Sequence, residues 1–248
     1  MLMTERFRLS CVELKYLLGS DEIDPFLASL GAASQDPSIR RDEWRIATVY
    51  LDREDRFFAR AGLSRPERRT EIRLREFFRP GGGRLSPFVW VESKQRNGTS
   101  ARVRRFQLHR RLVRRLLRGD LDEEQILDRQ ERFVEPDRVR RAAREVRSVA
   151  GPGPLVVSGA VTCLRTAIEG GSPIARLTLD REIRYHLEPA GWDPSTFGRA
   201  ALEERAGIVE MKYRGGRRPA WCDQRLGVEK PRNYSKFLIL SALAGVGG

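Results

Sequence analysis

The sequence predicts an α+β fold, a closed antiparallel β-barrel of about eight strands with helices packed outside it. Three observations lead to this expectation: polar and apolar residues alternate in several segments, an Asn-Gly pair separates two of these segments, and helical spacing is concentrated in residues 107–150 and about 234–245. Alternation is typical of half-buried strands, and Asn-Gly is typical of a tight hairpin turn. We expect one domain over residues 1–248.

The clearest alternating segment is GIVEMKYR, from Gly207 to Arg214. Side chains of a strand point to opposite faces with period two, so Glu210 and Lys212 share one face and Met211 lies on the other. Charged residues two positions apart recur in other β-like runs: Glu13 and Lys15; Glu71, Arg73 and Arg75; Glu92 and Lys94; Arg102 and Arg104; Arg176 and Asp180. This repetition predicts a sheet with one charged face.

The strands are predicted, in chain order, at 7–18, 45–52, 70–78, 88–96, 100–106, 155–169, 175–187 and 207–214. Residues 21–42 predict a short helix and a loop, and 107–150 predict a helical excursion. The C-terminal helix is expected to open near Ser235. Helix N-termini bind anions through free N–H groups, and Ser235 and Lys236 would add a hydroxyl and an ammonium to such a site.

The formal net charge of +13 and the pI of about 10.5 indicate a polyanionic partner: nucleic acid, an anionic membrane or a phosphate-rich small molecule. Lysine is rare, which makes its positions informative, because an ammonium suits a single phosphate oxygen. The lysines are Lys15, Lys94, Lys212, Lys230 and Lys236. The basic segment HRRLVRRLLR is typical of a solvated helix face, with binding to nucleic acid or a membrane as the alternative.

Three widely spaced cysteines, Cys11, Cys163 and Cys222, form no CxxC pattern. They indicate reduced thiols in a cytoplasmic protein, with no disulfide framework and no zinc site. The N-terminus lacks a signal-peptide pattern. The apolar tail 237–246 is too short to cross a bilayer of about 30 Å, so no transmembrane segment is expected.

The charged faces constrain the ligand if they converge inside a barrel. Two like charges about 6 Å apart repel by roughly 3 kcal/mol at an effective dielectric constant of about 20. The expected interior cations are Lys15, Arg73, Arg75, Lys94, Arg104, Arg165, Arg176 and Lys212. Such an interior favours a chain of phosphates as its guest. Among the acids, Glu210 is the first candidate for a hard divalent cation, Mg²⁺ or Mn²⁺.

A simpler alternative is that Glu210 and Glu92 only pair with Lys212 and Lys94. Covalent catalysis has no visible apparatus, because the chain has two histidines and no GxSxG context for a nucleophile. A P-loop is also absent from PGGGRLSP at 80–87, which lacks the GK[ST] ending. Phosphoryl transfer remains compatible with this chain, because it needs mainly positioning and charge neutralisation.

A series of short motifs, in order, resembles the VTC domain. This is the polyphosphate-polymerase domain of the vacuolar transporter chaperone family, within the triphosphate tunnel metalloenzymes of the CYTH-like superfamily. The motifs cover nearly the whole chain: ELKYLL (13–18), TVYLD (48–52), IRLR (72–75), VESK (91–94), LRTA (164–167), RLTLD (176–180), VEMK (209–212), PAW (219–221) and YSKF (234–237).

The resemblance implies a tunnel that binds ATP with Mn²⁺ or Mg²⁺ and transfers its terminal phosphoryl group to polyphosphate. It implies catalytic, phosphate-binding roles for Lys15, Arg73, Arg75, Lys94, Arg165 and Arg176. Further phosphate ligands would be Lys236, either Arg104 or Arg102, and then Lys212 and Ser235. Glu210 would hold the metal.

Three positions depart from the family pattern. Cys11 stands where related hydrolases have the first acid of an ExExK motif, which resembles the polymerase branch. Cys163 stands where family members place an aromatic residue near the nucleobase, and Asn233 stands where a basic residue is common. Nucleobase contact and phosphate affinity at the tunnel mouth are therefore expected to differ.

The leading hypothesis is a metal-dependent polyphosphate polymerase with ATP and polyphosphate as partners and no nucleic acid. One alternative is a tripolyphosphatase or nucleoside triphosphatase of the same fold. Another is a non-catalytic module that binds polyphosphate or nucleic acid through its arginine surface. The oligomeric state and a membrane partner stay open.

Overall fold

The computed structural model describes residues 12–33, 39–98, 100–128, 135–170, 175–213 and 231–246. Its strands are β1 (Val12–Leu18), β2 (Arg40–Asp52), β3 (Arg68–Phe78), β4 (Phe88–Asn97), β5 (Ser100–His109), β6 (Val156–Gly170), β7 (Ala175–His186), β8 (Leu202–Glu204) and β9 (Gly207–Tyr213). Its α-helices are α1 (Ile23–Ala33), α2 (Phe57–Ser64), α3 (Val113–Arg118), α4 (Glu123–Leu127), α5 (Pro136–Ala150) and α7 (Lys236–Leu243).

The chain divides into two compact units, and strands β2, β6, β7 and β8 contribute residues to both. The first unit takes its described residues from Met1–Arg45, Cys163–Ile183 and Glu203–Tyr234. The second takes them from Ile46–Thr162, Arg184–Leu202 and Ser235–Gly248.

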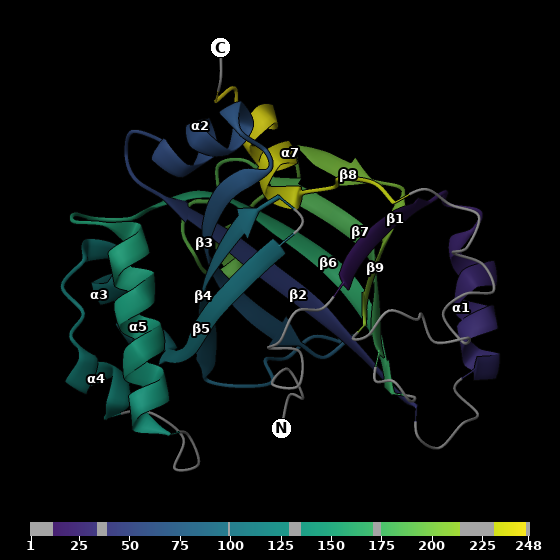
Figure 1. Ribbon diagram of the computed structural model, residues 1–248, viewed down its shortest axis with the longest axis horizontal. Helices are drawn as coiled ribbons and strands as arrows, with labels where there is room; N and C mark the ends of the chain where they lie inside the picture. Colours follow the sequence, from purple (N-terminus) through teal and green to yellow (C-terminus); the bar gives the residue numbers. More distant parts are fainter. Residues whose placement is uncertain are drawn as a thin grey trace. The chain divides into compact units, whose positions relative to one another are not determined.

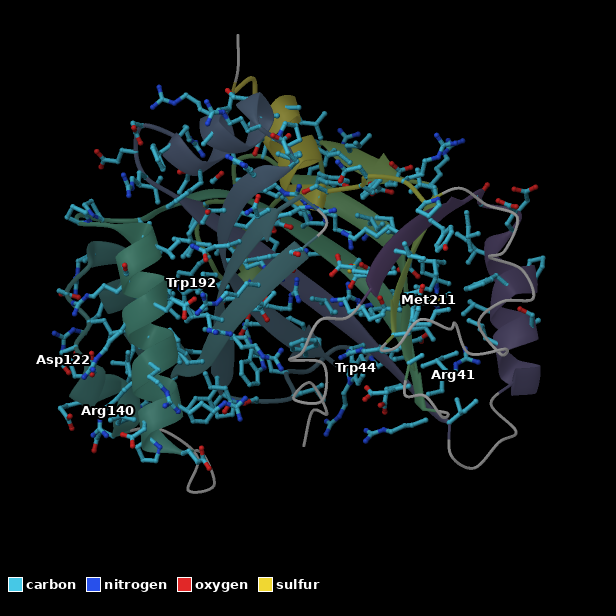
Figure 2. All side chains as sticks on the ribbon, viewed as in Figure 1. Arg41, Trp44, Asp122, Arg140, Trp192 and Met211 are labelled. Atoms are coloured by element: carbon cyan, nitrogen blue, oxygen red, sulfur yellow. The ribbon has the colours of Figure 1, made fainter. Side chains whose placement is uncertain are left out.

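In the first unit, β9 pairs antiparallel with β1 on one side and with β7 on the other. The apolar faces of these strands pack under α1, where Phe26 and Leu30 join a core that includes Tyr16, Leu177 and Met211. Met211 is labelled on β9 in Figure 2. The strand alternation predicted from the sequence is therefore confirmed here, because Tyr16, Leu177 and Met211 are all buried on the same side.

In the second unit, β3, β4 and β5 follow one another as antiparallel neighbours. The predicted hairpin is confirmed: Asn97 pairs with Ser100, and Gly98 has a φ of 58°, in the left-handed region that glycine adopts without strain. Helix α5 packs along β5 and β4 (Figure 1). It buries Val139, Ala142 and Val146 at helical spacing.

Helix α2 packs against α7 and β3 in the same unit (Figure 1). Its N-terminus has no side-chain cap from the adjoining residue, Arg56. Instead, the carboxylate of Asp52, at the end of β2, accepts hydrogen bonds from the N–H groups of Phe58 and Ala59, both at 2.9 Å. Asp52 is fully buried, and these bonds satisfy two of the donors that every helix start leaves open.

The expectation of a closed barrel is wrong. The strand order is β1-β9-β7-β6-β2-β3-β4-β5, with β8 beside β7, so within the described residues β1 and β5 are the two ends of a large antiparallel sheet. Alternation predicts which face of each strand is polar, but it carries no information on whether the end strands pair. The broader prediction of an α+β fold built on an antiparallel sheet is confirmed.

Several boundaries also differ from the prediction. Strand β2 begins at Arg40, inside the segment predicted as helix and loop, and β5 continues to His109. Helix α7, in contrast, starts where it was predicted to start, with Ser235 as its N-cap and Lys236 as its first residue. The predicted strand residues 7–11 and Arg214 lie outside the described residues, as do Cys11 and Cys222.

Among the described residues, no helix combines the length and the apolar character that a membrane crossing requires.

The Asp52 cap leads to a prediction about stability. Asp52→Ala leaves two buried N–H groups of α2 without acceptors, so we expect the free energy of unfolding to fall by about 2 kcal/mol. Asp52→Asn keeps one oxygen acceptor and is expected to lose less. Urea denaturation of the three proteins measures the difference, and equal stability of wild type and Asp52→Ala would contradict the capping role.

Candidate functional site

Most of the predicted site residues fall into two charged clusters, one in each unit. We call the first the β1–β9–β7 cluster: Glu13, Lys15, Arg176, Thr178, Asp180, Glu210 and Lys212 on these strands, and Arg165 on the neighbouring strand β6. We call the second the β3–β4–β5 cluster: Arg69, Glu71, Arg73, Arg75, Glu92, Lys94 and Arg105. Each lies on the strand faces opposite the apolar core residues of its own unit.

In the β1–β9–β7 cluster, the register of three strands produces cross-strand rows. Glu13 lies opposite Lys212, and Lys212 lies opposite Arg176. In the next row, Lys15 lies opposite Glu210, and Glu210 lies opposite Thr178. Directly opposite residues of antiparallel strands share a face, with Cβ atoms about 4.5–5.5 Å apart. Glu210 is thus flanked by an ammonium on one side and a hydroxyl on the other.

The carboxylate of Glu210 has ion-pair contacts through both oxygens. Its Oε1 lies 2.8 Å from Nζ of Lys212, and its Oε2 lies 3.5 Å from Nζ of Lys15. Lys212 also reaches Glu13, at 3.3 Å. Burial by itself lowers the pKa of Lys212, but the charges of Glu210 and Glu13 outweigh it and raise that pKa. Lys212 therefore stays protonated at neutral pH.

Arg165 forms the other strong pair of this cluster. Its guanidinium binds Asp180 through two nitrogens, with distances of 2.5 and 2.7 Å. Burial opposes the charge of Arg165, but Asp180 outweighs burial and raises the pKa of the guanidinium. A bidentate pair of this kind fixes the plane of the arginine.

Lys15 is held by the main chain of the segment that precedes α7. Its Nζ donates to the carbonyl oxygen of Tyr234 at 3.1 Å, and its own carbonyl accepts from the N–H of Arg232 at 2.7 Å. Among the described residues, the ammonium of Lys15 thus contacts this carbonyl, Glu210, and Glu13 at 3.9 Å.

The β3–β4–β5 cluster is built in the same way. Glu71 lies opposite Lys94, and Arg73 lies opposite Glu92, which lies opposite Arg105. Glu92 is almost completely buried and contacts three arginines: Arg73 at 2.8 Å, Arg75 at 3.5 Å and Arg105 at 3.7 Å.

The pKa values of the two carboxyls follow from these contacts. Burial raises the pKa of Glu92, but the positive charges of Arg75, Arg73 and Arg105 outweigh it and lower that pKa well below its usual range. Burial also raises the pKa of Glu71, and Lys94 contributes most to lowering it. Both side chains are therefore carboxylates at neutral pH.

Arg102 and Arg104 do not join this cluster. They lie on the opposite face of β5, where both bind Glu145 of α5, at 3.0 and 2.9 Å. The expectation that one of them accompanies Lys94 fails because the hairpin register pairs Lys94 with Val103 and Glu92 with Arg105. Arg105 is the basic residue of β5 that the structure places on the cluster face.

Arg105 is held from two directions. Its guanidinium carbon lies 4.4 Å from the centre of the Trp90 ring, a cation–π contact, and a nitrogen lies 3.7 Å from Glu92. The sequence contains a signal for Arg105, since RVRR places arginines on both faces of a strand. Alternation alone could not decide which of these two faces of β5 is the cluster face.

Ser235 and Lys236 lie at the start of α7, in the second unit. The Ser235 hydroxyl accepts a hydrogen bond from the N–H of Leu238 at 3.4 Å, as an N-cap does. Phe237 packs its ring 5.2 Å from that of Tyr50 on β2, which anchors this helix start in its unit. The predicted opening of a helix at Ser235 is confirmed.

Comparisons with known proteins find similarity to one family and to several solved structures. A search of curated proteins finds no match. Among solved structures, a candidate adenylate cyclase from Bacillus halodurans is 14% identical, with 83% of this chain and 80% of that chain covered and a TM-score of 0.46. A candidate adenylyl cyclase from Hippeastrum, described as having a dominant triphosphatase activity, is 13% identical. The match covers 94% of this chain and 96% of that chain, with a TM-score of 0.49. A protein from Pyrococcus horikoshii is 13% identical over 93% of this chain and 98% of that chain, with a TM-score of 0.44.

The family model gives the direct assignment. The model of the VTC domain matches residues 11–244, a range that contains every described residue of both charged clusters. With nearly the whole chain matched, this protein belongs to the VTC domain family.

Proposed function

We propose that the chain is a phosphotransferase that extends polyphosphate with the terminal phosphoryl group of ATP. The observation that carries this proposal is the charge of the β3–β4–β5 cluster, where five basic side chains face the two carboxylates of Glu71 and Glu92. Among the described residues of this cluster, positive charges outnumber negative ones, and like charges in a partly buried cluster repel one another. An anion with several charged oxygens removes that repulsion, and a chain of phosphates is such an anion.

Membership of the VTC domain family supports the same conclusion, since polyphosphate synthesis from ATP is what the resemblance implies. In the proposed roles, Arg73, Arg75 and Lys94 bind phosphate oxygens in the second unit. Lys15, Arg165, Arg176 and Lys212 do so in the first. Ser235 and Lys236 bind phosphate oxygens at the start of α7. We propose Arg105 as a further phosphate ligand, in the role that Arg102 or Arg104 was expected to fill.

The residues present fit a divalent cation that is held mainly by phosphate oxygens, with few protein ligands. Within the described ranges, no group of three or more His, Cys, Asp and Glu residues could hold a metal by itself. Glu210 is an oxygen donor whose side chain is 19% exposed, and Mg²⁺ or Mn²⁺ bound to phosphates needs few protein carboxylates. We propose that Glu210 holds such an ion. When bound, the ion neutralises charge on the phosphates during transfer.

The proposed reaction breaks the bond between the γ-phosphorus of ATP and its β,γ-bridging oxygen. The terminal oxygen of a polyphosphate chain forms the new bond to that phosphorus, and ADP leaves with the electron pair. The protein side chains form no covalent bond in this step. They hold the phosphates in line and offset the negative charge, which is the main requirement of phosphoryl transfer.

Lys94 provides the first test. We expect purified protein with ATP and Mn²⁺ to make a ladder of polyphosphate chains on a gel, and Lys94→Met to lower the rate by about a hundredfold, because one preorganised cation is lost. Arg102→Met, on the opposite face of the hairpin, is the matched control and should keep the ladder. A thermal melt of each variant checks folding.

The products decide between the proposal and its alternatives. Formation of orthophosphate without polyphosphate chains would show that the protein is a tripolyphosphatase or nucleoside triphosphatase and not a polymerase. Absence of turnover with several metals and triphosphates would leave a module that only binds polyanions.

A substitution at Glu210 distinguishes the role of the metal ion from the binding of phosphates. Glu210→Gln keeps the shape of the side chain but removes the charge, so we expect turnover to be lost and binding of tripolyphosphate without metal to be retained. Activity assays and calorimetric titration measure the two effects. Unchanged turnover in Glu210→Gln would argue against this residue as the metal ligand.

The hairpin register provides a matched pair of arginines. Arg105→Ala removes a cation from the cluster face, so we expect KM for ATP to rise about tenfold, the effect of losing a charge-assisted hydrogen bond. Arg104→Ala removes a partly exposed ion pair with Glu145, so KM should stay unchanged and stability should fall by about 1 kcal/mol or less. Steady-state kinetics on both variants would contradict the assignment if Arg104→Ala had the larger effect on KM.

A further inference from the structure

Thr178 of β7 has an unusual environment for a hydroxyl. It is 4% exposed, and its Oγ1 is buried without a hydrogen-bond partner in the part of the chain that the structure describes. A buried hydroxyl without a partner is unfavourable, and valine would fill the same volume without that cost. Thr166 of β6, for comparison, donates to Glu43 at 2.8 Å and accepts from Arg181 at 2.9 Å.

The position of Thr178 connects it to Glu210. The β7–β9 register places Thr178 directly opposite Glu210, on the face that also carries Arg176 and Asp180. Cβ atoms of such a pair lie about 4.5–5.5 Å apart, within reach of a hydrogen bond between a threonine hydroxyl and a glutamate carboxylate. The neighbours of Thr178 on the same strand, Leu177 and Leu179, belong to the apolar core.

The two lysines explain why Glu210 does not use this hydroxyl in the structure. Lys212 and Lys15 hold its two oxygens at 2.8 and 3.5 Å. Both ammoniums are candidate phosphate ligands, and phosphates would draw them away from the carboxylate. Thr178 carries no charge, so phosphates attract it much less, and its hydroxyl remains as a donor beside Glu210.

We propose that Thr178 is a positioning residue for Glu210. Its hydroxyl donates a hydrogen bond to one carboxylate oxygen and so orients the other toward the divalent cation when phosphates are bound. This inference rests on the proposed function of Glu210 as the metal ligand. Partners of this kind, which orient a ligand without touching the metal, commonly change metal affinity by about 10–100-fold when they are removed.

The test measures metal affinity with no turnover. Protein that carries an equimolar amount of β,γ-imido ATP is titrated with Mn²⁺, and electron paramagnetic resonance reports the free ion. We expect Thr178→Val to weaken Mn²⁺ binding about tenfold or more. Thr178→Ser keeps the hydroxyl and should bind Mn²⁺ within a few-fold of wild type. Binding of the nucleotide without metal should be the same in all three proteins.

Thr166→Val is the matched control, because it removes a buried hydroxyl from the neighbouring strand on the other face. It breaks two hydrogen bonds, so its melting temperature should fall while its Mn²⁺ affinity stays unchanged. Thr178→Val loses no hydrogen bond to any residue that the structure describes, so its melting temperature should stay the same or rise.

The outcomes separate this inference from the proposed function. Equal Mn²⁺ affinity of wild type and Thr178→Val, or weak binding in Thr178→Ser as well, would overturn the role of Thr178 alone. Wild-type protein that binds nucleotide but no Mn²⁺, or Glu210→Gln that binds Mn²⁺ as tightly as wild type, would overturn the metal site and this inference together.

Discussion

Buried charge is the constraint that organises both halves of this molecule. The strands place one face in an apolar core, which forces their charged residues onto the other face and close to one another. A buried ion without a partner is strongly unfavourable, so charged faces are stable only when opposite charges alternate across the strands. Arg73, Glu92 and Arg105 form such a row across three strands, and Glu13 with Lys212 and Lys15 with Glu210 pair opposite charges across β1 and β9.

The two clusters differ in how completely their charges cancel. In the β1–β9–β7 cluster, four basic residues accompany three carboxylates, and Glu210 and Asp180 each contact cations directly. In the β3–β4–β5 cluster, five basic residues accompany two carboxylates. The described charges of the first cluster are therefore closer to neutrality, and the second cluster carries the larger excess of positive charge.

Much of this arrangement could be predicted from the sequence, because alternation is a local property. The faces of β1, β7 and β9 follow from ELK, RLTLD and VEMK alone. The choice between Arg104 and Arg105 could not be made, because arginines occupy both faces of RVRR and only the register after Asn97 separates them. Closure of the sheet could not be predicted either, since it depends on whether β1 and β5 pair. The Asp52 cap could not be predicted because it depends on how the end of β2 meets the start of α2.

The order of the strands along the chain bears on how the protein folds. Strands β3, β4 and β5 are consecutive and joined by short connections, so their pairing closes small loops and has a low entropic cost. Strand β1 pairs with β9, and Val12 meets Tyr213 only after most of the chain has been synthesised. Contacts between distant residues form slowly. We therefore expect the arginine-rich hairpin strands to assemble early, while the strand that carries Glu210 gains its partner from the N-terminus late in folding.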